Sequence, residues 1–151
     1  MIISRTPFRI SFAGGGSDID AFYQNQAGAV VSTSINKYMY ITTHPFFAKK
    51  IQLKYSKTEL VDNVNDIQHP LIRETLRLLK IKDSIEITSV ADIPAGTGLG
   101  SSSSFTVGLL HVLSAYRGKF ISKEKLAQLA CKIEIEILKE PIGKQDQYAA
   151  A

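Results

Sequence analysis

The chain has 151 residues, 44% of them hydrophobic, and its formal net charge is +4. This length and composition allow one buried core, which excludes a disordered or low-complexity protein. The positive charge suits small anionic ligands, and an ordinary solvated surface explains it as well. No run of Lys and Arg with interleaved aromatic residues indicates a surface for nucleic acid.

The cysteine content and the N-terminus indicate the compartment. The single cysteine, Cys131, cannot form an internal disulfide and lies among apolar residues of an expected helix, which fits a reducing compartment and a packing role. The first residues lack the apolar segment of a signal peptide, and no apolar stretch approaches membrane-spanning length. We therefore expect a cytoplasmic protein with neither nucleic-acid nor membrane partners.

The first part of the chain predicts strands. Residues 8–13 alternate around Ile10 and Phe12 and predict a strand that leads into the sequence GGGSD. Residues 28–43 are rich in β-branched and aromatic residues, which favours two strands with a possible break at 36–37.

The middle of the chain alternates strand and helix patterns. Residues 51–56 and 84–90 predict strands, and in the second strand the isoleucines at 85 and 87 share a face. Residues 69–80 change to a helical period, with Pro70 well placed in the first turn. The expected apolar stripe of this helix is Leu71, Ile72, Thr75, Leu76 and Leu79.

Two helices are expected in the last third of the chain. The first begins near Ser101 and closes at Gly118, and the second is capped by Ser122 and ended by Pro141 and Gly143. Several strands precede these helices, so the fold class is predicted as α+β rather than as alternating βαβ units. The inward-facing residues of the second helix are expected to be Leu126, Leu129, Ala130, Ile133 and Ile137.

The segment IPAGTGLGSSSSF, residues 93–105, lies between a predicted strand and a predicted helix start. Free N–H groups at a helix start favour phosphate oxygens, glycines allow close approach of the backbone, and a serine hydroxyl can coordinate magnesium. A Walker A loop is excluded because no lysine occurs between Ala91 and Tyr116, and a dinucleotide fingerprint is excluded because Ser101 follows Gly100. A flexible turn before an ordinary capped helix remains the alternative.

Glu134 is the acidic residue of the second helix with an unusual position. Ala130 and Leu138 lie four residues to either side of it, on an otherwise apolar stripe, whereas Glu136 has charged residues at the same spacing. A carboxylate on an apolar stripe is unfavourable unless it meets a cation or hydrogen-bond donors.

The stretch PAGTGLGSSSS resembles the nucleotide-binding signature of the GHMP kinases, a family named for galactokinase, homoserine kinase, mevalonate kinase and phosphomevalonate kinase. The resemblance implies the N-terminal domain of that family, a ribosomal-protein-like α+β fold with a mixed or antiparallel sheet packed against helices. It also implies ATP and Mg²⁺, with Ser102 and Glu134 as the metal ligands. The residues expected to contact the nucleotide are Pro94, Gly96, Gly98, Leu99, Gly100, Ser101, Ser102 and Ser103.

Two further motifs resemble the same family. GKQDQ is similar to a Gly-x-x-Asp-Gln motif and puts Asp146 in the position of the catalytic base; the alternative is an aspartate that caps the next helix. RTPFRISFAGGGSD resembles the first motif, in which Arg9 matches an arginine and Asp18 matches an aspartate that binds sugar hydroxyls. An arginine beside Asp146 would keep that carboxylate ionised. The alternatives are a surface charge for Arg9 and a plain turn for GGGSD.

The expected substrate follows from the closest branch of the family. The chain looks most like the heptose 7-phosphate kinases, and GGGSD replaces the Gly-Glu-His-Thr-Asp segment of galactokinases, which counts against galactose. We expect phosphoryl transfer from ATP to C1 of D-glycero-D-manno-heptose 7-phosphate, for nucleotide-activated heptose. The residues expected to bind the sugar phosphate are Gly15, Gly16, Asp18 and Lys144.

The extent of the chain leaves other functions open. Residues 1–151 are expected to form the N-terminal ATP-binding domain, with a C-terminal GHMP domain absent from this chain, and the isolated fragment is expected to be inactive. The alternatives are a fucokinase- or galactokinase-like sugar kinase and a nucleotide-binding module without activity. A dinucleotide oxidoreductase is disfavoured by Ser101 and by the order of the strands.

Overall fold

The structure is a computed structural model that describes residues Met1–Ala151. Five strands form one mixed sheet in the order β1-β2-β5-β3-β4. β3 and β5 are parallel, and the other neighbouring pairs are antiparallel. The predicted α+β class with a mixed sheet is confirmed. The strands are β1 (Ile2–Ala13), β2 (Val31–Pro45), β3 (Ile51–Lys54), β4 (Thr58–Val61) and β5 (Ile85–Ala91).

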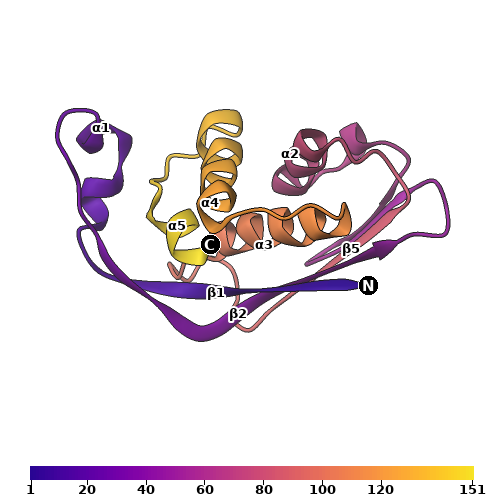
Figure 1. Ribbon diagram of the computed structural model, residues 1–151, viewed down its shortest axis with the longest axis horizontal. Coiled ribbons are helices and arrows are strands. Elements are labelled where there is room, and N and C mark those ends of the chain that lie inside the picture. Colours follow the sequence, from indigo (N-terminus) through magenta and orange to yellow (C-terminus); the bar gives the residue numbers. More distant parts are fainter.

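The main helices cover one face of the sheet. Figure 1 shows α2, α3, α4 and α5 on the same side of β1 and β2, while the short α1 stands beyond the end of β1. None of the helices has the length and apolar composition needed to cross a membrane. The helices are α1 (Asp20–Tyr23), α2 (Pro70–Leu79), α3 (Ser101–Tyr116), α4 (Lys123–Cys131) and α5 (Gln145–Ala150), with 3₁₀ turns at Gly15–Asp18 and Val64–Asp66 and a π-helical segment at Lys132–Ile137.

The core lies between the sheet and the helices α2 and α3. The predicted helix and strand boundaries in this region are largely confirmed: α2 has Pro70 in its first turn, α3 begins at Ser101, and both isoleucines of β5 are buried. The left-handed Gly118 (φ 66°) follows α3, as expected of a helix-ending glycine. Fully buried core side chains include Phe8, Ile41, Ile51, Leu53, Ile72, Leu76, Ile85, Ile87, Leu109 and Leu113.

The apolar alternation predicted for β1 does not mark its buried face. Ile10 and Phe12 are 37% and 68% exposed, whereas Ser4 and Thr6 are buried. Ile10 and Phe12 are exposed because the faces of β1 change at Phe8 and Arg9, which are both buried. At Ser4 and Thr6, α3 approaches β1 closely, since a Cβ added at Gly108 would lie 2.6 Å from Thr6 Oγ1. Small side chains fit there, and the Ser4 hydroxyl donates to the Gly108 carbonyl at 2.9 Å.

The break predicted at 36–37 is a β-bulge within one long strand. Pro7 pairs with Tyr38, but Arg9 pairs with Ser34, so Ile35–Lys37 lie opposite the single residue between Pro7 and Arg9. A bulge bends the strand and interrupts its alternation of faces. Phe8 and Arg9 are accordingly both buried although they are adjacent in β1.

The helix that follows Ser122 changes its pitch. Ser122 caps α4 as predicted, and of the five residues expected to face inward four are buried or partly buried. The fifth, Ile137, is 40% exposed, so this prediction is wrong. After Cys131 the chain continues as a π-helix, in which Leu138 N bonds to Ile133 O, and this longer spacing rotates the following residues. The helical segment ends before Pro141.

Candidate active site

The Arg9 side chain joins three distant segments. Its Nε and Nη2 atoms donate to Asp146 Oδ1 and Oδ2, each at 2.7 Å, and its Nη1 donates to the Gly98 carbonyl at 2.7 Å. The arginine side chain is only 10% exposed and the aspartate side chain 23%. A bidentate pair of this kind holds both groups in a fixed orientation. The ion pair expected from the sequence therefore forms, and it also contacts the glycine-rich loop.

The glycine-rich loop packs directly against this ion pair. Arg9 N donates to the Leu99 carbonyl at 3.1 Å. Gly100 has a φ of 75°, and a Cβ there would lie 3.4 Å from Arg9 Cγ and from Asp146 Oδ2. Both the left-handed backbone and the close approach therefore favour glycine. The loop ends in the first turn of α3, whose N–H groups have no partner within the helix.

Glu134 is fully buried beside the same helix start. Its Oε2 atom accepts hydrogen bonds from Ser103 Oγ and Gln147 Nε2, both at 2.9 Å, whereas its buried Oε1 atom has no partner. Burial raises the pKa of Glu134 above its usual value, and the hydrogen bonds offset this only in part. The sequence pattern located Glu134 but not these two contacts. Ser103, rather than the exposed Ser102, contacts the carboxylate.

The oxygen atoms of Glu134 and Ser102 are ligands of the kind that a hard cation prefers. The unpartnered Oε1 atom is a carboxylate oxygen in a site where a lone charge is unfavourable, and the Ser102 hydroxyl lies in the same first turn of α3 as Ser103. The chain has no cluster of three or more His, Cys, Asp or Glu side chains placed to hold a metal. A site with so few protein ligands is compatible with Mg²⁺, because this ion usually takes one or two carboxylates together with waters and phosphate oxygens.

A cavity of about 590 Å³ opens beside the glycine-rich loop. This volume lies in the range of small-molecule sites. Of the residues expected to contact a nucleotide, Pro94, Gly96, Ser101 and Ser102 line it. Its other walls include Met39 from β2, Ser89 and Ala91 from β5, and the aromatic residues Tyr55, His69 and Phe105.

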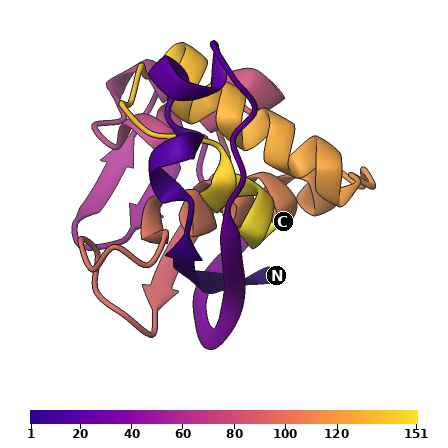
Figure 2. The ribbon, with the colours of Figure 1, turned by 90° about the vertical axis from the view of Figure 1, so that its left-hand side faces the viewer.

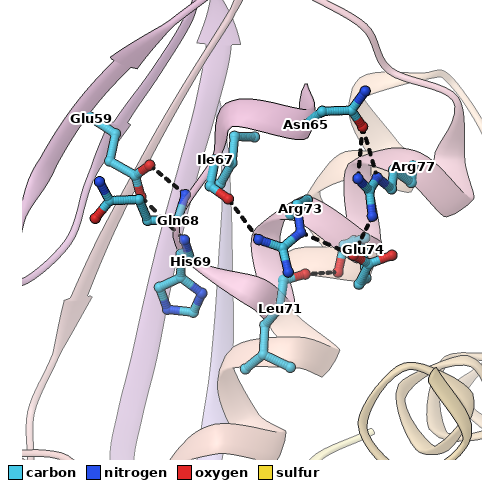
Figure 3. Close-up of polar contacts among 10 residues, drawn as sticks. Glu59, Asn65, Ile67, Gln68, His69, Leu71, Arg73, Glu74 and Arg77 are labelled. Carbon is cyan, nitrogen blue, oxygen red and sulfur yellow. Dashed lines mark hydrogen bonds and ion pairs between the residues drawn. The ribbon is translucent and has the colours of Figure 1, made fainter. Parts of the chain in front are cut away.

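One wall of this cavity is held by polar contacts that the sequence analysis missed. Glu59 accepts hydrogen bonds from Gln68 N at 2.7 Å and from His69 N at 3.3 Å (Figure 3). It also accepts one from the Tyr55 hydroxyl at 2.7 Å. The His69 ring stacks on Phe105 with centroids 5.1 Å apart. Burial raises the pKa of Glu59, but these hydrogen bonds outweigh it, so the pKa lies below its usual value. A charged Glu59 therefore fixes the turn that leads into α2.

A second cavity, of about 280 Å³, contains two of the expected substrate-binding residues, Asp18 and Lys144. The Asp18 carboxylate accepts from Gln145 N at 2.8 Å, and Lys144 Nζ lies 4.3 Å from the centroid of the Tyr23 ring. Figures 1 and 2 show why distant residues meet here, since the α1 segment stands beside the loop that leads into α5. The other two expected residues, Gly15 and Gly16, lie in the adjacent 3₁₀ turn but do not line the cavity.

Comparisons with known proteins identify the family of the chain. The sequence model described as "GHMP kinases N terminal domain" matches residues 69–151. The chain is 30% identical over 161 residues to the D-glycero-alpha-D-manno-heptose 7-phosphate kinase of Campylobacter jejuni, which covers 99% of the chain and 48% of that relative. It is 32% identical over 164 residues to the galactokinase of Pyrococcus furiosus, which covers 98% of the chain and 43% of that relative.

Solved structures show the same relationship. A D-glycero-D-manno-heptose 1-phosphate kinase from Bacteroides thetaiotaomicron superposes with a TM-score of 0.90 at 28% identity, over 100% of this chain and 53% of that one. The galactokinase of Lactococcus lactis, 22% identical, shares the fold with a TM-score of 0.78, over 97% of this chain and 41% of that one. The chain spans about half the length of the curated relatives it matches. It belongs to the GHMP kinase family and represents its N-terminal domain.

Proposed function

We propose that the protein is an ATP-dependent sugar kinase and that residues 1–151 form its N-terminal, ATP-binding domain. The observation that carries this proposal is the triple contact of Arg9, which binds both oxygens of Asp146 and the Gly98 carbonyl. This contact holds the Arg9 guanidinium and the Asp146 carboxylate directly against the glycine-rich loop. Phosphoryl transfer needs these groups together, because catalysis consists mainly of positioning and charge stabilisation.

ATP would occupy the larger cavity. Its phosphates would lie along the glycine-rich loop and at the start of α3, where free N–H groups and the helix dipole favour negative charge. The base would lie toward the aromatic wall that includes Tyr55 and His69. Ser102 and Glu134 are the residues that would hold Mg²⁺, and the metal would neutralise charge on the phosphate oxygens.

Asp146 would act on the acceptor. Its carboxylate accepts the proton of the sugar hydroxyl as the hydroxyl oxygen attacks the γ-phosphorus, and the bond to the bridging oxygen of ADP breaks. Arg9 orients the Asp146 carboxylate and counters the charge of the transferred phosphoryl group. The products are a sugar phosphate, ADP and a proton.

The acceptor that best fits is the hydroxyl at C1 of D-glycero-D-manno-heptose 7-phosphate. The relatives named as heptose phosphate kinases cover nearly the whole chain. In the smaller cavity, Asp18 would accept hydrogen bonds from sugar hydroxyls and Lys144 would meet the acceptor phosphate. A galactokinase- or fucokinase-like activity is the alternative, and the 32% identity to an archaeal galactokinase makes it worth testing directly.

A substrate panel on the full-length protein tests this proposal. ADP release with ATP and Mg²⁺ would be measured for heptose 7-phosphate, unphosphorylated heptose, galactose and fucose, with the product position assigned by NMR. We expect the highest kcat/KM for heptose 7-phosphate. A preference for a free hexose would overturn the choice of substrate, and the absence of transfer to every sugar tested would overturn the kinase proposal. The isolated 1–151 chain is expected to transfer nothing.

A further inference from the structure

The Glu134 carboxylate is held through only one of its two oxygens. Ser103 Oγ and Gln147 Nε2 both donate to Oε2, each at 2.9 Å. Oε1 is equally buried and has no hydrogen-bond partner, and the nearby Thr106 hydroxyl donates instead to the Ser102 carbonyl at 3.1 Å. Two hydrogen bonds to one oxygen restrict rotation of the carboxylate and leave the lone pairs of the other oxygen free.

The two donors come from the segments that carry the expected catalytic and metal-binding residues. Ser103 follows Ser102 in the first turn of α3, and Gln147 follows Asp146 in α5. Ser103 is 2% exposed and Gln147 is 0% exposed, so neither side chain lies free in solvent. Adjacent residues of α5 therefore face different partners, since Asp146 meets the opening strand and Gln147 meets Glu134.

The asymmetry of these contacts points to a function. An ionised carboxylate in a buried site is unfavourable unless its oxygens find partners, and a divalent cation is a suitable partner for the free oxygen. Residues that bond to a metal ligand commonly set its orientation, and their removal weakens metal binding. Neutral donors such as a hydroxyl and an amide can hold Oε2 without competing with a cation for charge.

We infer that Ser103 and Gln147 are positioning residues, which hold Oε2 of Glu134 and thereby direct Oε1 toward the divalent cation that accompanies the bound nucleotide. This inference rests on the proposed function and deepens it. It gives Ser103 a role different from the nucleotide contact expected of the loop serines. It also explains why a glutamine directly after Asp146 is fully buried.

The test is the effect of Mg²⁺ on nucleotide binding by the full-length protein. The Kd of β,γ-imido-ATP would be measured by calorimetry with Mg²⁺ and with EDTA, for the wild type, Ser103→Ala and Gln147→Met. We expect Mg²⁺ to tighten binding by the wild type, and this enhancement to fall about 10-fold in each variant. The Kd in EDTA should stay near the wild-type value, because the positioning acts through the metal.

Ser104→Ala is the matched control. Ser104 is 1% exposed and donates to the Pro7 carbonyl at 2.8 Å, so its removal also deletes a buried hydroxyl of α3 but leaves Glu134 untouched. Its Mg²⁺ enhancement should equal that of the wild type. Wild-type enhancement in Ser103→Ala and Gln147→Met would overturn the positioning role alone. Failure of the wild type to bind the analogue at all would overturn the proposed function, and the positioning role with it.

Discussion

One arginine side chain links the opening strand of this protein to two segments that follow 89 and 137 residues later. Arg9 uses Nε and Nη2 for Asp146 and Nη1 for the Gly98 carbonyl, all at 2.7 Å. The planar guanidinium supplies these donors in a fixed fork, which a lysine ammonium cannot reproduce. The orientation of Asp146 therefore depends on arginine in particular and not only on a positive charge.

Arg9→Lys is expected to lower kcat by on the order of 100-fold, because small misplacement of a catalytic group has effects of this size. The measurement is steady-state turnover of the full-length enzyme with its best acceptor. Arg5→Lys serves as the control, since Arg5 is exposed on the same strand and lies over the Tyr38 ring, 4.5 Å from its centroid. A kcat for Arg9→Lys equal to that of Arg5→Lys would contradict the assigned role.

At this scale the sequence predicted the charged residues better than the neutral ones. Glu134 was identified because a carboxylate on an apolar helical stripe needs a partner, and Arg9 and Asp146 because they match family motifs. Ser103 and Gln147 were not linked to Glu134, since a neutral hydroxyl or amide carries no comparable signal. Their contacts span 31 and 13 residues, and only the folded chain brings them together. The functional roles of all these residues remain predictions.

Among the elements, α3 approaches the sheet closely at Gly108. A Cβ at Gly108 would lie 2.6 Å from Thr6 Oγ1 and 3.3 Å from Ser4 Oγ. Glycine within a helix is destabilising by about 1 kcal/mol relative to alanine, so its presence here reflects the short distance to β1. This contact sets the position of α3 and thus of the serines in its first turn.

Gly108→Ala is expected to destabilise the full-length protein by about 1–3 kcal/mol, because the added methyl group clashes with β1 and outweighs the gain in helix propensity. Urea denaturation followed by circular dichroism measures the change in the free energy of unfolding. His111→Ala, at an exposed position of the same helix, should change it by less than about 0.5 kcal/mol. Stabilisation by Gly108→Ala would show that α3 does not approach β1 this closely.

The elements that the sequence predicted well have strong local signals. Pro70 and Ser122 mark helix starts, and the apolar period of α2 is regular. The elements it missed are β4, α1 and α5, which are only four to six residues long and have no such signals. The π-helical turn was also missed, because local spacing does not reveal that a turn contains one more residue than in an α-helix. Ile137 was therefore assigned to the wrong face.

In the whole molecule, the contacts of Arg9 bring β1, the glycine-rich loop and α5 together. The α+β class was predictable because strand patterns precede helix patterns. The strand order β1-β2-β5-β3-β4 and the bulge opposite Phe8 were not, since register depends on contacts between distant residues. In the proposed function, β1, the glycine-rich loop and α5 form one site for phosphoryl transfer, with Asp146 acting on the acceptor.

Turnover and nucleotide affinity of full-length Asp146→Asn test this claim most directly. We expect kcat to fall by about 100- to 10,000-fold, because a general base is lost, while the Kd of β,γ-imido-ATP with Mg²⁺ changes by less than about 3-fold. An Asp146→Asn enzyme that turns over its acceptor at the wild-type rate would contradict it.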